Sequence, residues 1–99
     1  MKTIKENNEE VNLIADKKWK EFYSECSESH NLSDRSIAAL LGISRQSVRN
    51  YEEGKTSPCV GTIMRINMVT HALNRAAEKN LLPAPTRRKQ DALVQEILK

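Results

Sequence analysis

The stretch LSDRSIAALLGISRQSVRNYEEGK, Leu32 to Lys55, holds two short helical patterns on either side of one glycine, Gly42. Ser33 and Ser44 each stand where a helix N-cap is expected, with a hydrophobic residue before the serine and another at the fourth helical position. Gly42 can take the positive φ of a helix end without steric cost. Because two residues separate the glycine from the second helix, the helices must cross steeply. The stretch therefore predicts a helix-turn-helix unit.

Small and apolar residues fill the positions at which the two helices must pack. Ala38 falls where the helices approach most closely, so a larger side chain would push them apart. The other expected packing positions are Ile37, Leu41, Ile43, Val48 and Tyr51. Every constrained position is suitably occupied, which makes the motif a specific signal.

The second helix carries many hydrogen-bond donors on the side that packing leaves free. Arginine can donate two hydrogen bonds to guanine, and glutamine or asparagine can pair with adenine. The residues of these types are Arg45, Gln46, Arg49 and Asn50. A charged helical face taken alone is usually solvated, but together with the complete motif spacing it favours contact with DNA bases.

The length of 99 residues predicts one domain, and the absence of β-branched runs with regular turn signals predicts that it is all-α. Aromatic residues make up only 4% of the chain, so the core is expected to be built mainly from aliphatic side chains. We expect a flexible N-terminal arm over residues 1–8 and a helix-turn-helix DNA-binding domain over residues 9–82. A C-terminal helix, a candidate for dimerisation, is expected within residues 83–99.

A first helix is predicted from Val11 to about Ser27, before the motif. Asn7 and Glu10 resemble a capping box at its start. The inner positions expected in this helix are Val11, Ile14, Ala15, Phe22 and Cys26, with Trp19 and Tyr23 alongside.

Helical periodicity resumes after the motif near Cys59. This helix either continues to about Asn80 or breaks near Asn67. Pro83 and Pro85 end it, because proline lacks an amide donor and restricts the residue before it. The inner positions expected are Val60, Ile63, Ile66, Val69, Leu73 and Ala77.

A last helix is expected after Thr86, which can cap it. The first turn holds Arg87, Arg88 and Lys89, cations that oppose the helix dipole. Solvated charge is the commoner explanation for them, and contact with phosphate or with a partner's acidic surface is the alternative. The apolar stripe must be buried on the same domain or against a second subunit, and its residues are Leu93, Val94, Ile97 and Leu98.

The net charge of +3 permits a polyanionic partner, and other features exclude several classes of protein. No apolar run approaches the roughly 18 residues of a membrane span, and the first residues contain no hydrophobic signal region, so we expect a cytoplasmic protein. Cys26 and Cys59 do not have zinc-site spacing with the two histidines. We therefore expect no metal, no cofactor and no disulfide, and both cysteines are predicted to be small buried residues.

The chain from Leu32 to about Ile66 resembles the DNA-binding domain of the Cro and phage-repressor type, also called the Xre family. The resemblance implies a compact five-helix domain, here with an additional C-terminal helix, that binds operator DNA as a homodimer and regulates transcription. The helix after the motif lacks the glycine stop of many relatives, so it serves either a dimer interface or the core alone. The residues that carry the resemblance are Ala38, Gly42, the run ISRQSV, Tyr51, Glu52, Gly54, Lys55 and Pro58.

In this family the second helix of the motif lies in the major groove and the first crosses the DNA backbone. The base-contacting residues implied by the resemblance are Ser44, Arg45, Gln46, Arg49 and Asn50. Ser47 lies closer to the helix pair and either contacts a phosphate or packs. The phosphate-contacting residues implied are Arg35, Ser36, Ser47, Lys55 and Thr56.

Two acidic residues of the motif need partners. Many relatives carry glutamine in place of Asp34, and a carboxylate there repels phosphate unless it turns inward to pair with Arg45 or Arg35. Glu52 is expected to brace the motif, with Arg65 or a backbone amide as its partner.

The combined features predict a sequence-specific DNA-binding transcriptional regulator, a repressor, that places residues 45–53 in the major groove of operator DNA as a homodimer. The alternative keeps the fold and changes the partner, as in a protein-interaction adaptor or an antitoxin. In either case the C-terminal helix is a candidate surface for a protein partner. An enzyme is not expected, because the sequence has no plausible nucleophile–base arrangement and no glycine-rich phosphate loop.

Overall fold

The computed structural model describes the backbone of residues 2–98 and the side chains of residues 13–98. These residues form five α-helices and no strand, which confirms the predicted all-α, Cro/repressor-like fold. The sequence predicted five helices and an additional C-terminal one, whereas the C-terminal helix is itself the fifth in the described residues, because the segment after the motif forms one unbroken helix. The helices are α1 (Lys2–Ser24), α2 (Asp34–Leu41), α3 (Arg45–Glu52), α4 (Val60–Glu78) and α5 (Arg87–Leu98), and a π-helical turn, Glu25–Ser29, follows α1.

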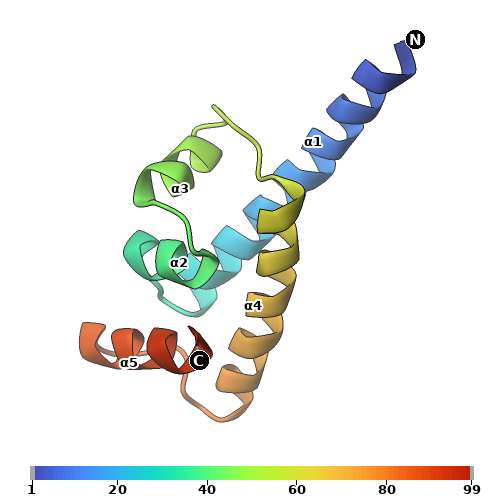
Figure 1. The fold of residues 1–99 in the computed structure, drawn as a ribbon. Helices are drawn as coiled ribbons and strands as arrows, with labels where there is room; N and C mark the ends of the chain where they lie inside the picture. Colours follow the sequence, from blue (N-terminus) through green and yellow to red (C-terminus); the bar gives the residue numbers. More distant parts are fainter. Residues whose placement is uncertain (1, 99) are drawn as a thin grey trace.

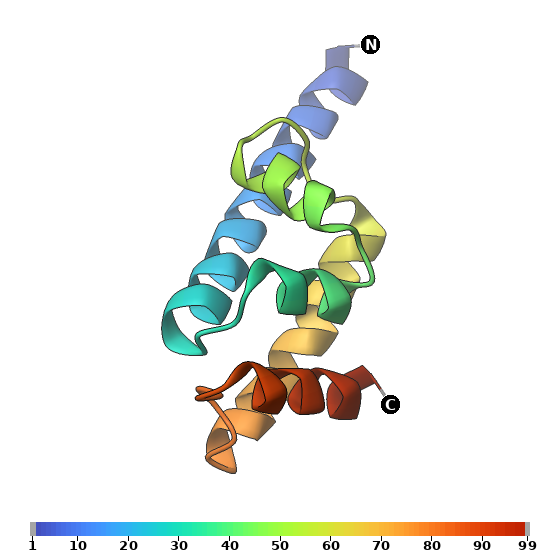
Figure 2. The ribbon, with the colours of Figure 1, turned by 90° about the vertical axis from the view of Figure 1, so that its left-hand side faces the viewer.

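The helices divide into two groups in space. The long helices α1 and α4 pack against each other, and α2 packs on α3, α4 and α5. Figure 1 shows α3, α2 and α5 projecting to the same side of this pair. Seen from that side in Figure 2, α3, α2 and α5 lie one below the other, with α1 and α4 behind them. One face of the molecule is therefore built from three helix surfaces.

The helix-turn-helix is held by the caps that the sequence predicted. The Ser33 hydroxyl accepts a hydrogen bond from the Ser36 amide, and the Ser44 hydroxyl accepts one from the Ser47 amide. Gly42 takes a φ of 67°, in the left-handed region. An L side chain at this φ costs energy, so glycine permits the sharp turn between α2 and α3.

Four helical segments end at a residue with positive φ. After α2, α3 and α4 the amide of the next residue donates to a carbonyl five positions earlier, as in a Schellman motif, whereas after the π-helical turn the Leu32 amide donates to the Cys26 carbonyl, six positions earlier. The positive-φ residues are Asn31, Gly42, Gly54 and Asn80. α4 is therefore continuous and ends at Glu78, before the prolines that were predicted to stop it.

α1 begins at Lys2, well before the start near Val11 that the capping pattern predicted. Residues 2–10 include several good helix formers and no glycine or proline, so nothing in this stretch interrupts the helix. The side chains of residues 1–12, Val11 among them, lie outside the described residues. The flexibility of residues 1–8 stays a prediction.

The buried face of α1 is centred on Trp19, which is 1% exposed. Ala15, Phe22 and Cys26 are buried as predicted. The prediction for Ile14 was wrong, because its side chain is 58% exposed. The buried residues recur at intervals of four, three and four along the helix, and Ile14 lies one position outside that stripe.

Trp19 attaches α3 to α1. Its indole Nε1 donates a hydrogen bond to Glu52 Oε1 at 2.7 Å, and its ring lies edge-on to the ring of Tyr51, with centroids 4.9 Å apart. Glu52 thus braces the motif, but the predicted partners were wrong. Arg65 instead donates from Nε to the Leu40 carbonyl at 2.9 Å.

α4 buries Ile66, Val69 and Leu73 as predicted. Val60 was wrongly placed in the inner stripe and is 67% exposed, because the buried positions of α4 start at Thr62 and continue through Ile66 and Val69. The neighbouring Ala76 is buried, and Ala77 packs only partly against the core.

α5 buries its apolar stripe on its own domain. Leu93 and Val94 join the core, and Ile97 packs against it. The predicted fourth member, Leu98, is instead 40% exposed near the end of the chain. Of the two possibilities for this stripe, burial against α2 is the one observed.

The two cysteines have opposite environments. Cys26 is fully buried as predicted, and burial raises the pKa of its thiol to about 12. Cys59 was wrongly predicted to be buried, because it stands at the exposed N-cap of α4. The Thr62 hydroxyl lies 3.4 Å from Cys59 Sγ, and this hydrogen bond lowers the pKa of the Cys59 thiol.

Candidate nucleic-acid interface

The outer face of α3 presents the predicted base-contacting side chains together. Ser44, Arg45, Gln46 and Arg49 are exposed, and Asn50 is half-buried. Val48 is fully buried on the opposite side of the helix. The two faces predicted for α3 are therefore observed, while the roles of these residues toward DNA stay predictions.

These side chains differ in how far they are already engaged. The Ser44 and Ser47 hydroxyls lie 3.0 Å apart, and Gln46 Nε2 donates to Asn50 Oδ1 at 3.0 Å. Within the described part of the chain, Arg45 and Arg49 form no ion pair or side-chain hydrogen bond. The guanidinium groups of Arg45 and Arg49 are thus free to bind a ligand, whereas Gln46 and Asn50 must first break the hydrogen bond between their side chains.

The loop after α3 holds the predicted phosphate contacts Lys55 and Thr56, which are both exposed. Their backbone amides donate to the Asn50 carbonyl and fold the loop back onto the end of α3. Lys55 Nζ lies 2.9 Å from Glu53 Oε2, and this contact lowers the pKa of the Glu53 carboxyl. A phosphate would therefore compete with Glu53 for Lys55.

Asp34 turns inward, but its partner is neither of the two arginines that the sequence suggested. The Tyr23 hydroxyl donates to Asp34 Oδ1 at 2.6 Å. This hydrogen bond, with partial burial, raises the pKa of Tyr23 to about 12. The carboxylate at the start of α2 is thus held by α1, and Arg35 and Arg45 are left for other contacts.

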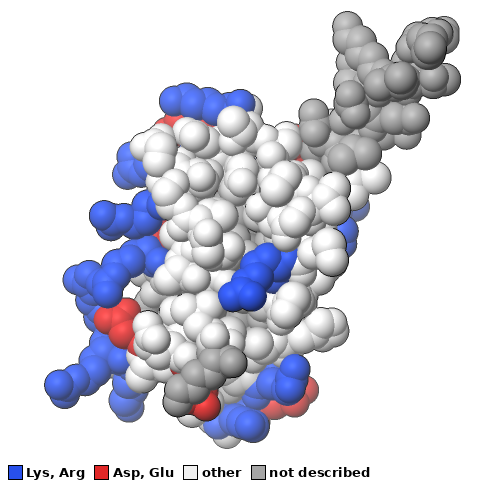
Figure 3. Space-filling model, in the orientation of Figure 1, with Lys and Arg blue, Asp and Glu red and all other residues white. Residues whose placement is uncertain are grey.

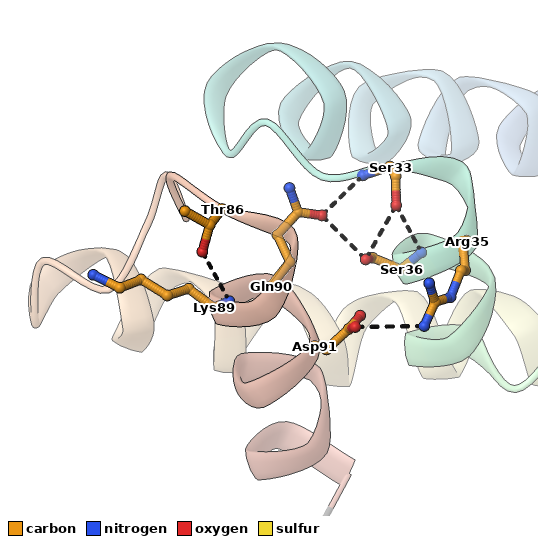
Figure 4. Close-up of polar contacts among 7 residues, drawn as sticks. All are labelled: Ser33, Arg35, Ser36, Thr86, Lys89, Gln90 and Asp91. Atoms are coloured by element: carbon orange, nitrogen blue, oxygen red, sulfur yellow. Dashed lines mark hydrogen bonds and ion pairs between the residues drawn. The ribbon is translucent and has the colours of Figure 1, made fainter.

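α5 is anchored to the start of α2 by Gln90, a residue that the sequence reasoning did not single out. Gln90 Oε1 accepts hydrogen bonds from the Ser33 amide at 3.3 Å and the Ser36 hydroxyl at 3.2 Å (Figure 4). Gln90 Nε2 donates to the Asn31 carbonyl at 2.8 Å. The sequence held a signal for this role. Gln90 lies three residues before Leu93 and so on the same helix face as the apolar stripe, which packs against the domain.

The two predicted phosphate contacts at the start of α2 both touch α5. Arg35 and Asp91 form an ion pair of 3.4 Å, in which both side chains are about half exposed (Figure 4). Ser36 is buried and is hydrogen-bonded to Gln90. In this arrangement Arg35 can still reach a ligand, whereas a contact from the Ser36 hydroxyl would require α5 to move.

Basic side chains gather on the face that carries α3. In Figure 3, Lys and Arg line the left-hand edge of the molecule, the side on which α3, α2 and the start of α5 lie in Figure 1. Nearby acidic groups are engaged: Asp34 by Tyr23, Glu52 by Trp19, and Asp91 by Arg35. This pattern suits a polyanion.

Residues 27–69 match a protein-family model described as helix-turn-helix. The match contains α2, the turn, α3 and half of α4, and it stops before α5. No curated protein matches the chain, and no solved structure does. Residues 27–69 are therefore a helix-turn-helix domain of the Cro/C1 type, the Xre family, and the protein class is that of a DNA-binding transcription regulator.

The described residues contain neither a group of three or more metal-ligating side chains nor a helix long and apolar enough to cross a membrane.

Proposed function

We propose that the protein is a sequence-specific DNA-binding repressor in the cytoplasm, with no enzymatic activity, and that it places α3 in the major groove of operator DNA. The observation that carries this proposal is the outer face of α3. It presents Arg45 and Arg49, which form no ion pair with any described residue, beside Gln46 and Asn50. These are the side chains suited to guanine and adenine edges.

Selection from random duplexes, followed by binding titrations over a range of salt concentrations, tests this proposal. Arg49→Ala should weaken binding by about 1–3 kcal/mol and relax preference at particular base pairs. Lys55→Ala should weaken binding to all duplexes alike and make the salt slope shallower by about 0.9. Arg75, an exposed arginine on α4, gives a matched control that should change little. Equal, small losses from Arg49→Ala and Lys55→Ala would contradict the major-groove assignment.

We also propose that the regulator acts as a homodimer, and an apolar stripe on α4 supports this. Val60, Met64 and Met68 recur every four residues and are 67%, 62% and 63% exposed. Exposed apolar stripes of this kind mark interaction surfaces. Sedimentation should show a dimer that Met64→Glu dissociates, and the selected site should be two-fold symmetric, with half-sites about 34–36 Å apart. A monomer on an asymmetric site would contradict the dimer.

Repression has its own test. Transcription in vitro from a promoter that overlaps the selected site should fall as the protein is added, and Arg49→Ala should abolish the effect. An increase in transcription would instead make the protein an activator. Absence of salt-dependent duplex binding would favour the protein-interaction adaptor.

A further inference from the structure

A cleft of about 490 Å³ opens where the first turns of three helices meet. α2 and α3 belong to the helix-turn-helix unit, whereas α5 lies outside the segment that matches the family. The residues that line the cleft are Ser33, Asp34, Arg35, Arg45, Arg87 and Gln90.

The cleft is suited to an anion. Among the residues that line the cleft, Arg35, Arg45 and Arg87 bring one guanidinium from each of the three helices and Asp34 brings the one carboxylate, while Arg35 is also paired with Asp91 from outside the cleft. The Asp34 carboxylate is held by the Tyr23 hydroxyl. The lining residues belong to the N-terminal ends of α2, α3 and α5, where a helix dipole is positive, which adds to the attraction for negative charge.

α5 is fixed in position to complete the cleft. Gln90 bonds to Ser33, Ser36 and Asn31, and Asp91 pairs with Arg35. The helix behind these contacts is buried through Leu93 and Val94. Arg87 lies one turn before Gln90 and is exposed, with no ion pair to any described residue. Its charge is therefore held beside the cleft and left available.

We propose that this cleft binds a phosphate of the DNA backbone, and that Arg87 makes α5 a second DNA-contacting element beside the helix-turn-helix. The inference rests on the proposed function. A free phosphate has the same chemistry, but the cleft lies next to the exposed face of α3, and Arg45 borders both. A duplex lying along α3 would bring its backbone to this place.

Arg87→Gln and Arg88→Gln in the full chain provide a matched test, because Arg88 is the neighbouring exposed arginine and does not line the cleft. Binding to the selected duplex is titrated at several salt concentrations. Arg87→Gln should bind several-fold more weakly, with a salt slope shallower by about 0.9 and an unchanged base preference. Arg88→Gln should change both quantities less. Arg87 forms no ion pair with any described residue, and as a cation in the first turn it opposes the helix dipole, so Arg87→Gln should not lower the melting temperature.

Four results would overturn the inference. Identical behaviour of the two variants would show that the cleft does not contact DNA, and if Arg49→Ala still impairs binding, the proposed function survives. Tighter binding by Arg87→Gln would show that α5 hinders DNA. Binding of inorganic phosphate can be followed by the NMR shifts of the Ser33 and Gln90 amides. If phosphate saturates the cleft while Arg87→Gln leaves the affinity for the duplex unchanged, the cleft is a free-phosphate site. A wild-type protein without salt-dependent duplex binding would end both proposals.

Discussion

The helix-turn-helix unit and α5 lie on the same face of the molecule, but they are held there by different means. Within the unit, α2 and α3 are set against each other by contacts between near neighbours in the chain, at Ser33, Gly42 and Ser44, while Trp19 and Tyr23 attach the unit to α1. α5 is fixed by side-chain contacts between residues more than 50 positions apart, such as Gln90 with Ser33. The first arrangement depends on local geometry, whereas the second forms only when the whole domain has folded.

The largest expected difference between the two regions lies in their cores. Leu40 of α2 is 0% exposed and Leu93 of α5 is 8% exposed. Leu40→Ala should lower the free energy of unfolding by about 3–5 kcal/mol, and Leu93→Ala by about 2–3 kcal/mol. Urea denaturation measures both. A loss for Leu93→Ala as large as that for Leu40→Ala would show that α5 is as integral to the core as the motif.

The turn of the motif should depend on one backbone angle. Gly42 has a φ of +67° and open space around it, so Gly42→Ala should cost only backbone strain, about 1–2 kcal/mol of stability. Gly61 lies inside α4, and an added Cβ there meets Cys59 Sγ at an ordinary distance of 3.9 Å. Gly61→Ala should therefore stabilise the protein, by up to about 1 kcal/mol. Thermal unfolding of the two variants should give shifts of opposite sign, and shifts in the same direction would contradict the strain argument.

A smaller, pH-dependent effect should separate the two contacts that hold the start of α2. The pKa of Tyr23 is raised from 10.0 to about 12, so the folded state favours the protonated phenol. The stabilisation is therefore complete below pH 10 and is lost as the pH rises toward about 12. Tyr23→Phe should remove this alkaline loss. Gln90→Leu, which breaks the contact with α5, should keep it, because the amide does not titrate. Chemical denaturation across this pH range checks both, and a loss that persists in Tyr23→Phe would assign it to another group.

The motif could be predicted closely from the sequence because each of its signals is local. The caps at Ser33 and Ser44 and the turn at Gly42 each involve residues within five positions of one another. The two faces of α3 follow from helical periodicity alone. The same reasoning misplaced Ile14, which lies one position to the side of the buried stripe of α1, and Val60, which lies beyond the end of the stripe of α4, since periodicity alone does not define how the neighbouring helix covers a stripe.

The partners of polar residues were the least predictable part of the candidate site. The sequence suggested Arg35 or Arg45 as the partner of Asp34, but Asp34 accepts a hydrogen bond from Tyr23 of α1. The sequence suggested Arg65 or a backbone amide as the partner of Glu52, but Glu52 accepts a hydrogen bond from Trp19. Such pairs depend on how helices distant in sequence cross. The cleft shared by three helix starts depends on the same geometry, so it could not be inferred before the fold was known.

The contact between Trp19 and Glu52 also makes Trp19 an intrinsic fluorescent probe of the position of α3. Trp19 is the single tryptophan of the chain, and its indole N–H touches the last residue of α3. Indole fluorescence responds to the loss of such a hydrogen bond and to entry of water. A duplex that shifts α3 relative to α1 would thus change the emission of the unlabelled protein, whereas a duplex that docks on a rigid α3 would leave it unchanged.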